Sequence, residues 1–232
     1  AGVPLTSVNG KQSSPNLCID GQGGAFAIWK DESLGSGIPS LYGTHLGPNE
    51  SDIINPGVGV LLNSSDLSYG GVSLEVSSAG SAILVWSYTI GLNDADLYAQ
   101  RIDTSCNTLW STPEEGGIPL CSADGAQQYV KVTYYSQNAS VVVWEDKRNN
   151  PSLGDIYVQY VDMDGNVLLD QAGESICTNG ANQIKPRVKA SPQGAYVVWE
   201  DTRNITSSGS DIFLQHHILG EGYNIDYIYI KS

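Results

Sequence analysis

Long apolar runs are missing from this sequence of 232 residues. No stretch approaches the roughly 18 consecutive apolar residues of a membrane-spanning helix, so membrane insertion is not expected. The first ten residues, AGVPLTSVNG, also lack the charged and apolar regions of a signal peptide, which predicts a mature, processed chain. No window shows a clear apolar period of 3.6 residues, so we expect almost no helix.

Positive charge is scarce as well. Against 25 Asp and Glu there are 11 Lys and Arg, which gives a formal net charge of -14. Such a chain repels phosphate backbones and anionic lipid surfaces, so nucleic acid is not an expected partner. Only 16% of the residues are charged, so the surface must be rich in hydroxyl and amide groups. That polarity predicts a secreted or cell-surface protein.

Motifs of common catalytic and cofactor sites are also absent. There is no phosphate-binding loop and no G-x-S-x-G elbow. His216 and His217 are adjacent on an expected strand, so they point to opposite faces and cannot share a metal. The segment DMDGN from Asp162 lacks the later glutamate of a calcium loop and is interpreted as a hairpin turn. We therefore expect no metal and no cofactor.

Cysteine is rare, and no C-x-x-C spacing supports a zinc or redox site. The four cysteines are Cys18, Cys106, Cys121 and Cys177. They allow three pairings, among which a bridge within CNTLWSTPEEGGIPLC, complemented by a bridge between the other two, is the candidate that closes a short loop. N-glycosylation is permitted at the N-x-S/T sequons of Asn49, Asn63, Asn138 and Asn204.

What the sequence does contain is internal repetition. Tryptophans stand in similar apolar contexts at Trp29, Trp86, Trp144 and Trp199, separated by 57, 58 and 55 residues. A second block follows each of them, as SLYGTH, DLYAQR, DIYVQY and DIFLQH, which open at Ser40, Asp96, Asp155 and Asp211. A third block precedes each, beginning at Gly2, Gly57, Gly117 and Gly173. Four units of about 57 residues therefore fill a single domain, 1–232, with bounds of about 1–55, 56–115, 116–172 and 173–232.

Each unit has the chemistry of short strands. Runs rich in Val, Ile and Tyr are separated by turns such as SPQG and MDGN, and apolar residues stand on both parities of a strand. Four-stranded sheets covered on both faces and repeated without helices predict an all-β fold, a β-propeller of four blades. AGVPLT at the start and YNIDYIYIKS at the end are expected either to complete one blade together or to exchange strands between subunits.

The last two units resemble a known family of repeats. VVWEDKR with DIYVQY, and VVWEDTR with DIFLQH, are similar to the W-x-D-x-R and D-I-Y-x-Q repeats of secreted bacterial propeller proteins, found in surface and exported proteins of Bacteroidota-like organisms. Unit one has Asp31 without the arginine, and unit two has Tyr88 in place of the first acid. The resemblance implies an exported scaffold and no particular enzymatic activity.

The group formed by Glu145, Asp146, Arg148 and Asp155 allows two interpretations. As an active site it would combine paired carboxylates with an arginine that binds an anionic sugar. However, Arg203 repeats Arg148 one unit later, and a ring would keep the two apart. We therefore interpret Arg148 as a tie between Asp146 and Asp155. The residues of this structural motif are Trp29, Asp31, Trp86, Asp96, Trp144, Asp146, Arg148, Asp155, Trp199, Asp201, Arg203 and Asp211, and no catalytic residue is assigned.

The function that these patterns favour is a non-enzymatic extracellular structural or adhesion module, self-assembling through its terminal strands. Copies of itself, other surface proteins and glycans are the expected partners. A carbohydrate-binding propeller is the alternative. A glycoside hydrolase is a third class, and it requires a cluster of acids that breaks the repeat. LNDADLY at 92–98, in the most divergent unit, is the one place where such a cluster is expected.

Overall fold

The computed structural model describes residues 2, 4–33, 39–49, 52–64, 69–77, 80–135, 138–204, 209–220 and 228–229. None of them is helical, which confirms the all-β expectation for this part of the chain. No helix with the length and apolarity to span a membrane occurs among these residues.

In the described part of the chain, sixteen strands form four antiparallel sheets of four strands each, in simple sequence order. Sheet one contains β1 (Gln12–Ile19), β2 (Ala25–Asp31), β3 (Ser40–Leu46) and β4 (Val60–Asn63). Sheet two contains β5 (Tyr69–Ser77), β6 (Ser81–Gly91), β7 (Asp94–Ile102) and β8 (Ile118–Cys121). Sheet three contains β9 (Gln127–Tyr135), β10 (Ala139–Asp146), β11 (Asp155–Asp162) and β12 (Glu174–Cys177). Sheet four contains β13 (Gln183–Ser191), β14 (Gly194–Asp201), β15 (Asp211–His217) and β16 (Ile228–Tyr229).

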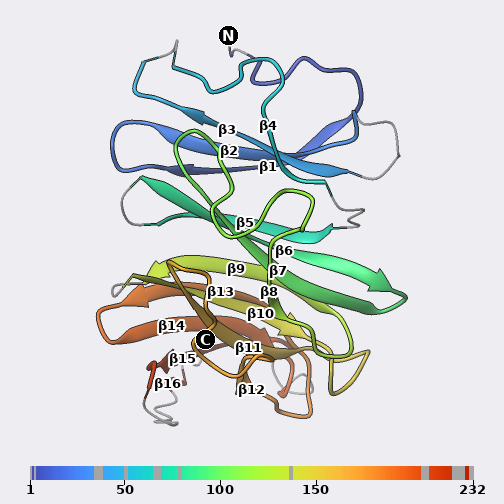
Figure 1. Ribbon diagram of the computed structural model, residues 1–232. Coiled ribbons are helices and arrows are strands. Elements are labelled where there is room, and N and C mark those ends of the chain that lie inside the picture. Colours follow the sequence, from blue (N-terminus) through green and yellow to red (C-terminus); the bar gives the residue numbers. More distant parts are fainter. Residues whose placement is uncertain are drawn as a thin grey trace.

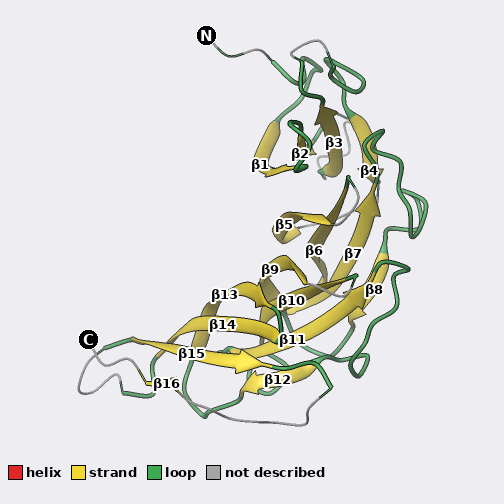
Figure 2. Ribbon diagram, turned by 90° about the vertical axis from the view of Figure 1, so that its left-hand side faces the viewer, coloured by secondary structure: helices red, strands yellow, loops and turns green. Residues whose placement is uncertain are grey.

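The four sheets stack face to face along an arc (Figure 1). Figure 2 shows the innermost strands β1, β5, β9 and β13 on the concave side, with β4 and β8 on the convex side. This is the radial arrangement of propeller blades. Because sheet one and sheet four lie at opposite ends of the arc, the predicted closed ring of four blades is not formed (Figure 2).

An apolar layer fills each of the three spaces between sheets. Each layer joins a tryptophan on one sheet to aliphatic residues of the sheet before it: Trp86 packs with Phe26 and Ile28. Trp144 lies in the layer that contains Ile83 and Val85, and Trp199 in the layer that contains Val141 and Val143. Both parities of a central strand are thus buried, as the sequence predicted. We call the face that carries the tryptophan the front of a sheet and the opposite face its rear.

A bulge interrupts each innermost strand opposite the tryptophan. In β9 the register shifts after the pair Gln128 and Glu145, and the next residue, Tyr129, is left-handed with φ of 54°. Ser14 and Lys185 repeat this conformation in β1 and β13, with φ of 53° and 54°. Left-handed residues other than glycine are strained. Their recurrence at the same place shows that the bulge is a regular feature of β1, β9 and β13.

The expected unit boundaries are shifted relative to the sheets. The glycine-led block was taken as the start of a unit, whereas it forms β8 and β12, the outermost strands of the preceding sheets. In sheet one the equivalent glycine is Gly59 rather than Gly57, because Gly59 directly precedes β4 and lies against the Trp29 ring. A sequence repeat shows the length of a unit but not which strand comes first in a sheet. The sequence therefore could not locate the boundary between sheets.

The chain ends do not complete one blade together. Near the start, Leu5 and Ser7 exchange backbone hydrogen bonds with Gly57 of sheet one. At the other end, β16 pairs with β15 of the same chain and supplies the fourth strand of sheet four. The rest of the predicted C-terminal strand lies outside the described residues. The predicted closure of the ring by both ends is therefore wrong for the described strands.

Candidate functional site

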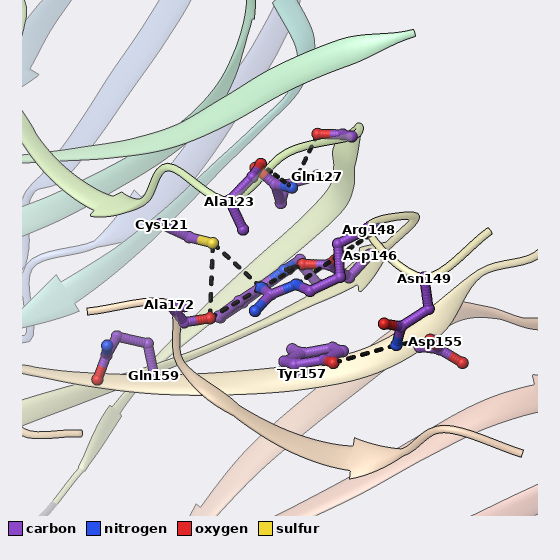
Figure 3. Close-up of polar contacts among 12 residues, drawn as sticks. Cys121, Ala123, Gln127, Asp146, Arg148, Asn149, Asp155, Tyr157, Gln159 and Ala172 are labelled. Carbon is purple, nitrogen blue, oxygen red and sulfur yellow. Dashed lines mark hydrogen bonds and ion pairs between the residues drawn. The ribbon is translucent and has the colours of Figure 1, made fainter. Parts of the chain in front are cut away.

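The arginine of the W-x-D-x-R motif joins neighbouring sheets (Figure 3). Arg148 Nη2 donates to Asp146 Oδ2 at 2.6 Å, and its Nε donates to Asp146 Oδ1 at 2.9 Å. The same Nη2 lies 3.2 Å from the Cys121 sulfur in sheet two and 2.8 Å from the carbonyl oxygen of Ala172. One side chain thus connects the end of β10 to the outer strands of two sheets, while Asp146 is completely buried.

Aromatic rings complete this connection. The Arg148 guanidinium lies 4.0 Å from the centre of the Tyr157 ring, which stacks on Trp144 with centroids 6.0 Å apart. Trp144 Nε1 in turn donates to Asp146 Oδ2 at 2.7 Å. Sheet four repeats the arrangement, with Arg203 on Asp201, on the Phe213 ring and 3.1 Å from the Cys177 sulfur. Repetition at two sheets is the pattern expected of structural residues, and this role of Arg148 and Arg203 stays a prediction.

The second acid of the motif has a different partner from the one predicted. Asn149 Nδ2, rather than Arg148, donates to Asp155 Oδ2, at 2.8 Å. Asn204 holds Asp211 in the same way, at 2.9 Å. The amide is one residue further along the loop and therefore reaches the start of the next strand, whereas the guanidinium is turned toward the neighbouring sheet.

The motif is incomplete in sheets one and two. Trp29 Nε1 still donates to Asp31, at 3.2 Å, but no arginine follows. In sheet two Tyr88 replaces the aspartate and packs edge-on against Tyr98. Trp86 Nε1 is buried and has no hydrogen-bond partner among the described residues. Asp96 opens the second block, and burial together with the nearby Asp94 raises its pKa. Sheet two is therefore the irregular member of the set.

The cysteines do not form the predicted bridges. All four thiols are free. Cys121 and Cys177 contact the two arginines, and Cys106 and Cys18 belong to the apolar layer between sheets one and two. Burial raises the pKa of the Cys18 and Cys106 thiols to about 12. The bridge from Cys18 to Cys177 would have to span from sheet one to sheet three.

The predicted glycosylation sequons differ in accessibility. Asn49 and Asn138 are exposed in turns, where a glycan would meet solvent. Asn63 is completely buried in β4, so a glycan there is incompatible with this fold. Asn204 is partly buried and donates to Asp211.

The irregular sheet two also borders a polar pocket. Its hairpin turn consists of Leu92 and Asn93 alone, because Gly91 pairs with Asp94 across it. Sheets one, three and four have longer connections at this end. A cavity of about 230 Å³ lies between this hairpin and the corresponding loop of sheet three. Its lining is formed by Ser87, Thr89, Asn93, Asp94, Ala95, Ala126, Gln128, Lys147 and Pro151. We call it the hairpin pocket.

Asp94 is the carboxylate in this pocket. Its Oδ1 is buried and has no hydrogen-bond partner among the described residues. A buried carboxylate oxygen without a donor is costly, and such groups are rare in native structures. An atom of this kind in the wall of a polar pocket is suited to a hydroxyl or water donor supplied from within the pocket.

A second carboxylate, Glu145, contacts two residues of the pocket lining and the Lys185 backbone N–H of sheet four, and is only 2% exposed. Its Oε1 accepts a hydrogen bond from Gln128 Nε2 at 2.7 Å and lies 3.8 Å from Lys147 Nζ, and both of these side chains line the pocket. Burial raises the pKa of Glu145, against the opposing effects of Gln128 and Lys147. A carboxyl group in such an environment can be held protonated and serve as an acid.

Two further hollows are less suitable as a candidate site. The larger, about 610 Å³, is lined by Asp170 and Glu174 and by residues up to Gly220, where the described part of the chain is interrupted. The other, about 190 Å³, lies on the rear of sheet four. Among the described residues, no group of three or more His, Cys, Asp or Glu is placed to hold a metal ion. The hairpin pocket is therefore the candidate site.

Comparison with known proteins identifies similar folds and no sequence family. No protein-family model matches the sequence, and no curated protein matches it. Solved structures do. The GH93 α-L-arabinofuranosidase of Fusarium graminearum, in complex with arabinobiose, matches with a TM-score of 0.59 and 11% identity over 98% of this chain and 69% of that one.

Two other carbohydrate-cleaving enzymes match comparably. The α-L-arabinanase of Penicillium chrysogenum, complexed with arabinobiose, has a TM-score of 0.58 and 12% identity, and covers 92% of this chain and 65% of that chain. The endo-arabinase of Bacteroides thetaiotaomicron has a TM-score of 0.51 and 12% identity, with 90% and 75% covered. This chain thus spans about two thirds to three quarters of their length. The likeness shows the propeller fold.

These matches correct the expected function. The sequence favoured a non-enzymatic structural or adhesion module, whereas the propellers that resemble this chain are glycoside hydrolases. The error arose because the repeated W-x-D-x-R group drew attention to residues that hold the sheets together. Asp94 and Glu145 were missed as a pair, although Asp94 lies within the segment 92–98 that the sequence singled out.

Proposed function

We propose that this chain is a propeller glycoside hydrolase whose active site is the hairpin pocket, with Asp94 and Glu145 as its two carboxylates. The observation that carries the proposal is the buried, unpartnered Oδ1 of Asp94 in the wall of a polar pocket. Glycoside hydrolysis requires two carboxyl groups in different protonation states, and the burial of Glu145 raises the pKa of one of them.

The environments of the two acids assign their roles. Glu145, whose pKa is raised by burial, is the proposed acid and donates its proton to the oxygen of the leaving sugar. Asp94, as the carboxylate, either takes a proton from the attacking water or attacks the sugar carbon itself, and in the second case water then releases the product. Gln128 orients Glu145 through the hydrogen bond of 2.7 Å to its Oε1.

Lys147 controls access to Glu145. Its Nζ lies 3.8 Å from Oε1, beyond hydrogen-bond distance, and 25% of its side chain is exposed. The Glu145 carboxyl is itself only 3% exposed, and its Oε2 accepts a hydrogen bond from the Lys185 backbone N–H at 3.4 Å. A sugar therefore reaches Oε1 only when Lys147 moves aside.

The pocket wall matches a sugar. Ser87, Thr89 and Asn93 provide hydroxyl and amide groups around Asp94. At about 230 Å³ the cavity is smaller than the usual pocket of a drug-sized ligand, about 300 Å³ or more, which suits one small sugar ring. The matched enzymes include an α-L-arabinofuranosidase and an arabinanase bound to arabinobiose, so we propose an α-linked pentose oligosaccharide as substrate, degraded outside the cell.

Hydrolysis of arabino-oligosaccharides by the purified chain tests the proposal. We expect release of reducing sugar, and a loss of about 10²- to 10⁴-fold in kcat/KM for Asp94→Asn and for Glu145→Gln. Glu114→Gln is the matched control, because Glu114 is exposed and lies away from the pocket lining. If the chain binds these oligosaccharides but never cleaves them, it is a lectin-like propeller and the proposed activity is wrong.

A further inference from the structure

The two end sheets of the arc each expose a face that is covered everywhere else in the molecule. Inside the arc, the rear of each sheet packs on the front of the next, three times in succession. Sheet four has no following sheet on its rear, and sheet one has no preceding sheet on its front (Figure 2). These two faces carry the residues that form the internal contacts.

On the rear of sheet four the exposed residues are Tyr196 and Ile212, which are 44% and 58% exposed. The positions that match Tyr196, three residues before each tryptophan, are Phe26, Ile83 and Val141, at 0 to 1% exposed. The positions that match Ile212 are Leu41, Leu97 and Ile156, all at 0%. This face therefore has the composition of a sheet-to-sheet contact and lacks its partner.

On the front of sheet one the innermost strand β1 exposes Leu17 and Ile19, at 69% and 71%, whereas Ala27 and Trp29 of the central strand are only 7% and 5% exposed. Leu17 pairs with Ala27, two residues before Trp29. The matching residues of the other innermost strands, Leu74, Val132 and Val188, are 6 to 9% exposed. Each of them is buried by the rear of the preceding sheet, which is the surface that sheet four leaves open.

We propose that the rear of sheet four binds the front of sheet one of a second copy of this chain, head to tail. The two faces are complementary because the same pair of faces meets three times within the arc. Such a contact is heterologous: it closes into a ring when the rotation per copy allows and continues as an open assembly when it does not.

The repeated packing of the same two faces, rather than charge, argues for a copy of the chain as the occupant. Lys185 and Arg187 line the hollow on the rear of sheet four beside Ile212, and Glu200 in the same hollow pairs with Lys185 at 3.2 Å. With a net charge of -14, the copies repel one another at low ionic strength.

The test is the mass of the chain in solution, measured by light scattering during size-exclusion chromatography in about 0.5 M salt, which screens the net repulsion. We expect a mass of at least twice the monomer's 24.7 kDa. Leu17→Asp and Ile212→Asp should each reduce the mass to that of the monomer. Leu109→Asp, at a residue 45% exposed and away from both faces, should leave the assembly unchanged.

Mixing the two variants gives the decisive result. Ile212→Asp keeps an intact front of sheet one, and Leu17→Asp keeps an intact rear of sheet four, so an equimolar mixture has one working contact and should form a dimer and nothing larger. A wild-type chain that stays monomeric at all concentrations overturns the proposal. So does a mixture that stays monomeric while both variants show wild-type circular dichroism and melting.

Discussion

Arg148 reaches from sheet three to Cys121 of sheet two, with its Nη2 3.2 Å from the sulfur and 2.6 Å from Asp146 Oδ2. This geometry predicts that Arg148→Ala destabilises the fold, because the completely buried Asp146 loses its counter-ion. Removal of one partner of a buried ion pair costs about 3 to 5 kcal/mol, which corresponds to roughly 6 to 20 °C in Tm for a protein of this size. Thermal unfolding measures the loss. Lys11→Ala, in an exposed ion pair, is the control and should change Tm by less than about 2 °C. A variant at Arg148 with the Tm of wild type would show that the contact contributes nothing.

In sheets one, two and three the glycine before the outermost strand is required by the tryptophan beside it. At Gly117, with φ of +86°, a Cβ would lie 2.6 Å from the Trp86 ring and 2.7 Å from the Ala99 carbonyl oxygen. Gly117→Ala should therefore add overpacking, about 1 to 3 kcal/mol, to the left-handed strain of about 1 to 2 kcal/mol. Gly209→Ala, with φ of +79° and open space around it, should show the strain alone. Denaturant unfolding compares the two, and equal losses would mean that the ring moves aside.

The raised pKa of Glu145 predicts that activity and stability both fall as pH rises. Burial raises its pKa, so the acid form that donates the proton is lost as pH rises through that pKa, and kcat/KM should fall there. The folded state also binds this proton more tightly than the unfolded state, so stability falls over the same pH range.

Glu145→Gln removes both effects. The variant should gain Tm relative to wild type as pH rises from 4 to 8, because the wild-type carboxyl becomes charged only above its raised pKa. Melting curves across this range provide the measurement. A variant that is less stable than wild type at pH 8 and equally stable at pH 4 would indicate that the charged form of Glu145 stabilises the fold.

The free thiols predict slow reaction in the native protein. With a pKa of about 12 for Cys18 and Cys106, a fraction on the order of 10⁻⁴ of each is thiolate at pH 8. Titration with a thiol reagent should proceed slowly in buffer and reach four equivalents in denaturant without reductant. Fewer than four equivalents in protein purified under non-oxidising conditions would show that the native protein contains a disulfide.

The sequence predicted the repeating layers better than the site. Trp29, Trp86, Trp144 and Trp199 recur because each sheet must fill the same space against its neighbour, so their spacing alone indicated the all-β repeat. Neither the start of a sheet nor the curvature of the arc follows from a repeat, and both were predicted incorrectly. Arg148 is visible in the sequence because it repeats.

The candidate site is hidden for the opposite reason. Asp94 and the residues that contact Glu145, Gln128 and Lys147, are in different units and line one pocket only because the two-residue hairpin after Gly91 leaves space beside the loop that contains Pro151. A local sequence pattern does not show which residues of two different sheets will lie beside the same pocket. The one available signal was the irregularity of unit two.

A crystal structure of Glu145→Gln soaked with arabinobiose tests the central claim most directly, because this variant keeps the pocket while the proposed acid is lost. The disaccharide should lie in the hairpin pocket, uncleaved, with a sugar hydroxyl donating to Asp94 Oδ1. An empty hairpin pocket in well-ordered crystals, or a sugar bound only on another surface, would contradict the assignment of this pocket as the active site.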